Sequence, residues 1–333
     1  MKHINVSIFV PHAGCPHQCS FCNQKSISGK SSQPTPQDVE DAAKTALKYS
    51  AELASNGEIA FFGGSFTAID RDYMISLLQA AQPFIGNGGF KGIRISTRPD
   101  AINDEICDIL KKYNVTAVEL GAQSTDDKVL SLNRRGHTRE DIIKASNLLK
   151  SRGFELGLQM MTGLYGSDDD ESICTAKDII ALKPKTVRIY PTVVLKDTPL
   201  AELYQSGEYN PQTVESAAKL CAKLLLMFEE ANITVIRLGL HSGGDVESGY
   251  IAGAYHPAFR ELCENRIYFD KITTALSDKP HGKYIIFVPS TDISKAAGQR
   301  KSNITELKKL GYDCTVKADS SLSGRDILIE TNG

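Results

Sequence analysis

The sequence predicts an α/β fold, a partial (β/α)6 barrel of six successive strand–helix units followed by a small α+β appendix. Two observations support this prediction. Short apolar runs alternate with longer amphipathic segments as far as about residue 190. Such alternation is typical of a parallel sheet with right-handed crossovers. Six units are too few to close an eight-stranded barrel, so the barrel is expected to stay open.

Each predicted strand is a short apolar run, and a segment of helical periodicity follows it. Strands are expected at 8–10, 58–62, 92–97, 117–123, 155–161 and 186–191. Helices are expected at 36–56, 71–84, 104–113, 139–153 and 171–182. Thr35 and Pro36 are typical of an N-cap and a first helical position. A helix at 212–231 and a closing strand at 233–240 are expected to complete the barrel.

The polar, breaker-rich segment 277–282 is the predicted linker, which divides the chain into a core domain at 1–276 and a small α+β domain at 281–333. In the small domain we expect a strand at 283–289, a helical stretch at 292–311 broken at Gly298, and strands at 314–317 and 327–330.

Composition places the chain among ordinary globular proteins. It has 333 residues, of which 41% are hydrophobic and 23% charged, and a net charge of −2 that gives no global case for nucleic-acid binding. There is no apolar run of transmembrane length and no secretory leader at the N-terminus. The protein is therefore expected in the cytoplasm, where thiols stay reduced.

Three of the eight cysteines are clustered as C-x3-C-x2-C at Cys15, Cys19 and Cys22, directly after the first apolar run. Three thiolates can hold three irons of a cubane cluster and leave the fourth iron open to a small ligand. The alternative is a structural zinc site in which His12 or His17 is the fourth ligand.

Polar residues and glycines also occur inside or directly after the predicted strands, where parallel α/β folds bind their ligands. They are Gly63, Gly64, Ser65, Thr97, Arg98, Glu119, Gln123, Gln159 and Arg188. Glu119 and Gln123 are four apart and are expected on the same side of one strand. Two alternatives remain, because the glycine pair could form only a tight turn and Glu119 could form a structural ion pair with Arg188.

The cysteine triplet, with Phe21 before its last member, resembles the radical S-adenosylmethionine (SAM) superfamily. There SAM chelates the open iron of a [4Fe–4S] cluster and is cleaved by one electron to methionine and a 5′-deoxyadenosyl radical, which removes hydrogen from the substrate. The resemblance spans about residues 5–265. It implies Cys15, Cys19 and Cys22 as cluster ligands and the residues at the strand ends as the SAM pocket, although Ser65 stands where many members have an acid.

Further segments resemble the branch of this superfamily related to the Elongator catalytic subunit, which modifies wobble uridine in tRNA. They are residues 62–67 (FGGSFT), 96–100 (STRPD), 119–124 (ELGAQS), 135–138 (RGHT) and 255–260 (YHPAFR). The resemblance implies a tRNA-modifying enzyme. Only about fifty residues follow the predicted linker, too few for the acetyltransferase domain of the Elongator subunit, so acetyl-CoA-dependent chemistry is not carried over.

The resemblance also implies partners: tRNA, and a reducing electron donor of the flavodoxin or ferredoxin kind, with no membrane. It assigns no catalytic residue. Tyr190 and Tyr255 are candidate hydrogen donors, although tyrosines at strand ends commonly serve packing. Two other functions stay open, a radical SAM enzyme acting on a small molecule and a non-catalytic zinc- and RNA-binding module.

The appendix has its own resemblance, because residues 297–304 (AGQRKSNI) are similar to the helix–GxxG–helix core of KH RNA-binding domains. In that module the loop holds the sugar-phosphate backbone. Lys301 replaces the second glycine and adds positive charge beside Arg300, so both residues are candidate RNA contacts. The alternative is a small capping unit with a solvated basic loop.

Overall fold

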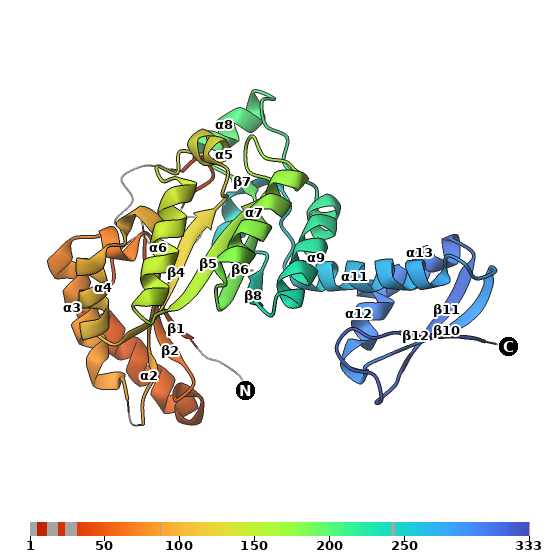
Figure 1. Cartoon of the computed structure of the whole chain (residues 1–333), viewed down its shortest axis with the longest axis horizontal. Helices are drawn as coiled ribbons and strands as arrows, with labels where there is room; N and C mark the ends of the chain where they lie inside the picture. The colour runs from red at the N-terminus through yellow and green to blue at the C-terminus, as the bar shows by residue number, and fades with distance from the viewer. Residues whose placement is uncertain (1–4, 12–18, 24–31, 87, 241–243, 333) are drawn as a thin grey trace.

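The computed structural model of the protein describes residues 5–11, 19–23, 32–86, 88–240 and 244–332. Its main feature is a seven-stranded sheet in the order β1-β2-β3-β4-β5-β6-β8, in which all neighbouring strands are parallel. The sheet is curled into a half-barrel with helices on its outer face (Figure 1). The predicted α/β partial barrel is therefore confirmed.

The strands of the half-barrel are β1 Asn5–Val10, β2 Glu58–Gly63, β3 Gly92–Thr97, β4 Val115–Gln123, β5 Glu155–Thr162, β6 Thr186–Pro191 and β8 Thr234–Leu238. The helices of this part are α2 Pro36–Ala54, α3 Arg71–Ala81, α4 Asp104–Lys112, α5 Asp127–Leu132, α6 Arg139–Ser151, α7 Asp169–Leu182, α8 Pro199–Gln205, α9 Val214–Glu230 and α10 Gly244–Gly249. Short 3-10 turns lie at Phe66–Ala68, Gln82–Phe84 and Pro99–Ala101.

The sequence specifies these elements locally. The strands are nearly continuous apolar runs because helices and barrel interior cover both faces, and eight of the nine residues of β4 are buried. The outer helices begin at side chains that accept a hydrogen bond from a backbone N–H of the first turn. At α6, Thr138 and Asp141 form a reciprocal capping box.

Short elements near the carboxyl ends of the strands were not predicted from the sequence. β7 Val193–Leu195 and β9 Tyr250–Gly253 form a separate antiparallel pair. Helices α5 and α8 lie near them at the same end of the sheet (Figure 1). Elements of three to seven residues contain too few turns or alternations for a periodic pattern to be read from sequence.

The appendix follows α11 Phe259–Leu276 and comprises β10 Gly282–Val288, α12 Ile293–Ala297, α13 Ser302–Lys309, β11 Tyr312–Ala318 and β12 Leu328–Thr331, with 3-10 turns at Ser290–Asp292 and Gln299–Lys301. Its sheet has the order β11-β10-β12, parallel in the first pair and antiparallel in the second.

Helix α11 belongs to both parts of the molecule and connects them (Figure 1). Its first half supplies Phe259, Cys263 and Ile267 to the main core. Its second half supplies Tyr268 and Ile272, among others, to a separate core with the appendix sheet. The predicted linker at 277–282 is therefore a turn between α11 and β10, and the division into two domains there stays a prediction.

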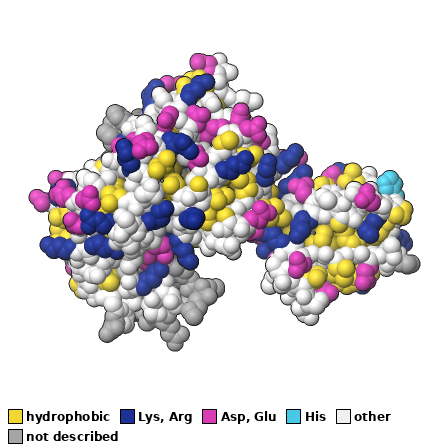
Figure 2. Space-filling view, in the orientation of Figure 1, with side chains coloured by type: hydrophobic (Ala, Val, Ile, Leu, Met, Phe, Trp, Pro, Cys, Tyr) yellow, Lys and Arg dark blue, Asp and Glu magenta, His cyan; other side chains and the backbone are white. Residues whose placement is uncertain are grey.

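Charges of both signs are interspersed on the face of the molecule shown in Figure 2, in keeping with the net charge of −2. Within the described ranges, every helix is too short or too polar to span a lipid bilayer.

A hydrogen bond in the appendix core gives a first prediction. The hydroxyl of Tyr268 donates to Asp292 Oδ2 over 2.6 Å, and both side chains are buried. Tyr268→Phe should destabilise the appendix by about 1–3 kcal/mol, since the carboxylate loses a buried donor. Hydrogen exchange should show lower protection in β10 and β11 and unchanged protection in β3 and β4. Tyr49→Phe, at an exposed tyrosine, is the control. Equal protection in both variants would contradict the prediction.

Candidate functional site

The carboxyl ends of the seven strands form one rim of the half-barrel, and the cysteine segment, residues 19–23, lies there. The side chains of Cys19 and Cys22 are both half-buried, and the N–H of Cys22 donates to the carbonyl of Cys19 over 3.1 Å. Cys15, His12 and His17 lie outside the described residues. Among the described residues no three His, Cys, Asp or Glu side chains gather as a metal site, so the structure does not choose between the cluster and the zinc alternative.

Gly63 and Gly64 lie against the end of β1. The N–H of Gly64 donates to the carbonyl of Val10 over 2.7 Å. Gly63 has φ of +112°, and a Cβ atom there would lie 2.8 Å from the same carbonyl oxygen. No other residue fits this close approach, because the positive φ and the clash both exclude a side chain. The predicted glycine segment therefore lies next to the strand from which the cysteine loop departs.

Ser65, Thr97 and Arg98 are brought together directly behind these glycines. Ser65 Oγ lies 2.9 Å from Thr97 Oγ1 and accepts from the N–H of Arg98 over 3.0 Å. Both hydroxyl side chains are buried, and Thr67 joins them at 2.7 Å from Thr97. The Arg98 side chain pairs with Asp100. The ends of β2 and β3 are thus tied by side chains that already have partners within the chain.

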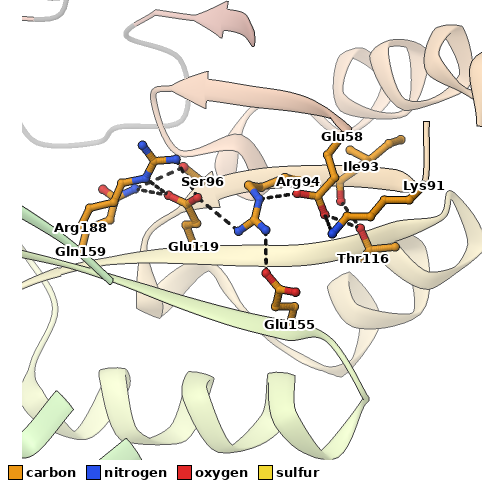
Figure 3. A network of polar contacts seen from close by, with 10 residues as sticks. All are labelled: Glu58, Lys91, Ile93, Arg94, Ser96, Thr116, Glu119, Glu155, Gln159 and Arg188. Atoms are coloured by element: carbon orange, nitrogen blue, oxygen red, sulfur yellow. Dashed lines mark hydrogen bonds and ion pairs between the residues drawn. The ribbon is translucent and has the colours of Figure 1, made fainter. Parts of the chain in front are cut away.

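Glu119 lies inside the half-barrel and is 1% exposed. Arg188 donates to both of its oxygens, over 2.6 and 2.9 Å, Gln159 donates over 3.0 Å, and Arg94 over 3.3 Å (Figure 3). A carboxylate offers about four acceptor positions, and these four bonds use them. The ion pair expected as the alternative for Glu119 and Arg188 is therefore present, and Glu119 as a cofactor ligand stays a prediction.

Arg94 extends this network toward the amino ends of the strands (Figure 3). It is 3% exposed and donates to Glu58 over 2.6 Å and to Glu155 over 2.7 Å. Burial opposes the charge on Glu58, but Arg94 outweighs it and the pKa of Glu58 is lowered. Burial likewise disfavours the charge on Arg188, but Glu119 outweighs it and the pKa of Arg188 is raised. The interior is thus a chain of paired, ionised groups.

Gln123 and Arg135 both lie beside Gly121 and have buried polar atoms without partners among the described residues, and Arg135 contacts the cysteine segment. Gln123 ends β4 at φ of +68°, is 8% exposed, and its Oε1 has no hydrogen-bond partner among the described residues. Arg135 donates to Cys19 Sγ over 3.1 Å and to the carbonyl of Gly121 over 2.7 Å. Its buried Nε also has no hydrogen-bond partner among the residues that the structure describes. Buried polar atoms without partners are rare in native proteins, and a water molecule or a ligand can supply the missing partner.

Arg94 and Arg135 were not among the site residues predicted from the sequence. Arg94 is a charged residue inside an apolar strand run, the same signal that selected Arg188, so the pattern contained it. Arg135 belongs to the 135–138 segment of the family resemblance, and only the folded loop shows that it contacts a cysteine.

The residues proposed for RNA lie in the appendix, at the turn between α12 and α13. Gly298, Arg300 and Lys301 have φ of +78°, +53° and +61°. A Cβ on Gly298 would lie 2.5 Å from Ser302 Oγ, so this position requires glycine. Arg300 and Lys301 are exposed or nearly so, with no ion pair among the described residues. The predicted helical stretch with a break at Gly298 is thus observed, with a break of four residues.

Two family models match the chain. The radical SAM superfamily model covers residues 9–179, just over half of the chain, and the radical SAM C-terminal domain model covers residues 184–268. The chain belongs to the radical SAM superfamily. Its members are enzymes that use a [4Fe–4S] cluster and SAM, which supports the cofactors expected from the sequence.

Two curated relatives match part of the chain. The tRNA uridine(34) acetyltransferase of Methanocaldococcus jannaschii is 33% identical over 183 residues, covering 49% of this chain and 34% of the relative. Human Elongator complex protein 3 is 30% identical over 202 residues, covering 54% and 37%. The chain thus spans about a third of the length of these relatives.

A solved structure shows the same fold. It is that of the archaeal Elp3 of Methanocaldococcus infernus with an N-terminal deletion, and it matches 84% of this chain and 66% of its own with a TM-score of 0.63 and 20% identity.

The described residues fit the cofactors of a radical SAM enzyme. Two thiols, the ligand type of iron–sulfur clusters, lie at the rim of the half-barrel. Gly63 packs directly against the end of β1. Gln123 and Arg135 both lie beside Gly121, each has a buried polar atom without a partner among the described residues, and Arg135 contacts Cys19. A zwitterionic ligand such as SAM requires such donors and acceptors.

His137 lies just behind Arg135 and gives a second prediction. It is 4% exposed, and its Nε2 lies 3.2 Å from the carbonyl oxygen of Ala122. Burial, and next the charge of Arg135, lower the pKa of His137 to about 4. The ring is therefore neutral in the folded protein at pH 7 and donates from Nε2.

Between the folded-state pKa of about 4 and the unfolded value of 6.5, the unfolded chain binds a proton at this position and the folded chain does not. The free energy of unfolding should therefore fall as the pH decreases from about 6.5 to 4, by about 3 kcal/mol from this group. Urea unfolding at pH 7 and pH 5 should show a smaller pH dependence in His137→Asn than in the wild type. An identical pH dependence would contradict the prediction.

Proposed function

We propose that this chain is a radical SAM enzyme that modifies a uridine in tRNA. The observation that carries the proposal is the contact between Cys19 and Arg135, whose Nε has no partner among the described residues, at the rim of a radical SAM half-barrel. The uridine comes from relatives named tRNA uridine(34) acetyltransferase and Elongator complex protein 3. The proposal includes a location in the cytoplasm and a flavodoxin- or ferredoxin-like electron donor.

In this proposal Cys15, Cys19 and Cys22 hold the cluster. The remaining predicted residues, Gly63, Gly64, Ser65, Thr97, Arg98, Glu119, Gln123, Gln159 and Arg188, form the SAM pocket. When bound, the two cofactors together supply one-electron chemistry that removes a hydrogen atom from an unactivated C–H bond.

The role of each residue in the pocket follows from which of its polar atoms already have a hydrogen-bond partner within the chain. Gly63 allows β2 to end directly against β1, and Gln123 Oε1 and Arg135 Nε offer an acceptor and a donor. Glu119, with four bonds, orients Arg188 and Gln159 from within the barrel. Arg188 lies with its guanidinium 5.2 Å from the centre of the Phe62 ring, so its position is fixed on two sides.

The direct test is SAM cleavage. After anaerobic reconstitution with iron and sulfide, the reduced wild-type protein should convert SAM to methionine and 5′-deoxyadenosine. Cys19→Ala and Cys22→Ala should reduce both cluster content and turnover to background, because each removes a proposed ligand. Cys174→Ala, at an exposed cysteine on α7, is the matched control and should retain both. A colourless protein that carries zinc would instead support the binding-module function.

The substrate is tested separately. Nucleoside mass spectrometry of tRNA from a strain that lacks the gene should show the loss of one modified uridine. If all tRNA nucleosides are unchanged and SAM is still cleaved, the small-molecule alternative is favoured.

We also propose that the appendix loop with Arg300 and Lys301 contacts the tRNA backbone. The loop is held in one place by the buried Asn303 side chain, which donates to the carbonyls of Asn265 on α11 and Ala296 on α12 over 2.9 and 3.1 Å. A groove of about 630 Å³ between α9 and α11, beside the appendix, carries three more cations, Lys219, Lys223 and Lys271. Lysine and arginine side chains attract phosphates.

Arg300→Ala combined with Lys301→Ala should weaken tRNA binding and reduce the slope of log K against log salt by about 1.5, because two phosphate contacts are lost. Affinity titrations at several salt concentrations measure this slope. Lys283→Ala combined with Lys308→Ala removes the same charge from exposed positions outside the loop and should leave the slope unchanged. Identical slopes in both double variants would show that the loop is only a solvated surface.

A further inference from the structure

A fully buried asparagine connects the cysteine segment to the rest of the half-barrel. Asn133, the residue after α5, is 0% exposed. Its Nδ2 donates to the carbonyl of Val129 over 2.8 Å and to that of Tyr165 over 2.9 Å. Its Oδ1 accepts from Ser20 Oγ over 2.7 Å, and its backbone carbonyl accepts from the N–H of Ser20 over 3.2 Å. Both the amide and the backbone of Asn133 thus bind the residue next to Cys19.

A second group of contacts holds the same segment from the other side. The carbonyl of Ser20 accepts from the N–H of Leu200, at the start of α8, over 2.8 Å. The Phe21 ring packs against a small core that contains Leu200 and Tyr209. Asn23 Nδ2 donates to the carbonyl of Lys196 over 3.0 Å.

The second group of contacts comes from residues 192–209, which are not one of the strand–helix units. This segment contains β7 and α8, and its described contacts with the cysteine segment use backbone groups and apolar side chains.

We propose that Asn133 is a positioning residue for the iron–sulfur cluster, and that it acts by holding Ser20 in place beside residues 192–209. The inference rests on the proposed function, since it takes Cys19 and Cys22 as cluster ligands. The cysteine segment contains no helix or strand that would fix it, so its contacts set where its two thiols lie. Cluster binding requires the thiols to converge within a few tenths of an ångström, which a supporting shell of hydrogen bonds provides.

The same loop also sets the electrostatic surroundings of Cys19. Two residues after Asn133, Arg135 donates to Cys19 Sγ over 3.1 Å. Hydrogen bonds to the sulfurs are one of the determinants of a cluster's reduction potential. A positive donor stabilises the more negative, reduced state, and its loss shifts the potential downward. Releasing Ser20 from Asn133 should therefore change both how firmly the cluster is held and its potential.

The test compares Ser20→Ala and Asn133→Ala with the wild type, each as the full chain reconstituted anaerobically. Ser20→Ala removes a single hydroxyl and leaves the two hydrogen bonds from Asn133 Nδ2 in place. It therefore tests the positioning of the cysteine segment without disturbing the fold around Asn133. Iron loss to a chelator should be about tenfold faster in both variants, the effect typical of losing a supporting partner of a metal ligand. The midpoint potential from an EPR-monitored titration should move to a more negative value.

Asn303→Ala is the matched control, because Asn303 is also a buried asparagine that donates to backbone carbonyls, but in the appendix. It should lose stability and keep the wild-type iron retention and potential. Wild-type retention and potential in both Ser20→Ala and Asn133→Ala would overturn the inference while leaving the proposed function intact. A wild-type protein that takes up no iron–sulfur cluster would overturn the proposed function itself, and the inference with it.

Discussion

The half-barrel is organised around a carboxylate that has no access to water. Glu119 joins β4 to β3 through Arg94, to β5 through Gln159 and to β6 through Arg188, so four adjacent strands share one charged centre. A buried charge is tolerated only when its partners are complete, and removal of one partner leaves an uncompensated ion. The register of these strands is therefore constrained by the side-chain bonds to Glu119 as well as by the backbone hydrogen bonds of the sheet. The polar groups at the rim therefore lie at fixed positions, because the ion pairs beneath them fix the strands.

The architecture could be predicted because each level of the sequence agrees with the others. Apolar runs short enough for strands alternate with capped, amphipathic segments, and parallel strands necessarily bring their carboxyl ends to one rim. Residues as far apart as Gly63, Gln123 and Arg188 could thus be placed in one region without coordinates. The short elements β7, β9, α5 and α8 could not, because they are stabilised by their neighbours and carry little periodic signal of their own.

The site was predictable in its residue types and not in its pairings. A polar residue within an apolar run indicates an interior position, which selected Glu119 and Arg188 and applies equally to Arg94. The sequence does not show whether such a residue faces a ligand or another side chain. Asn133 lies outside this reasoning altogether, because its neighbour Ser20 is 113 positions away. Its role depends on two loops that meet only in the folded chain.

Helix α11 has a geometric consequence for what this protein can hold. It is one uninterrupted helix of 18 residues, about 27 Å long, with one end in each hydrophobic core. A continuous helix anchored at both ends acts as a stiff connection, so the appendix cannot swing freely against the half-barrel. Asn303 ties the basic turn at Arg300 to Asn265, in the first half of this helix. The turn is therefore held at a fixed distance from the main core, and a ligand that contacts both parts has to match that distance.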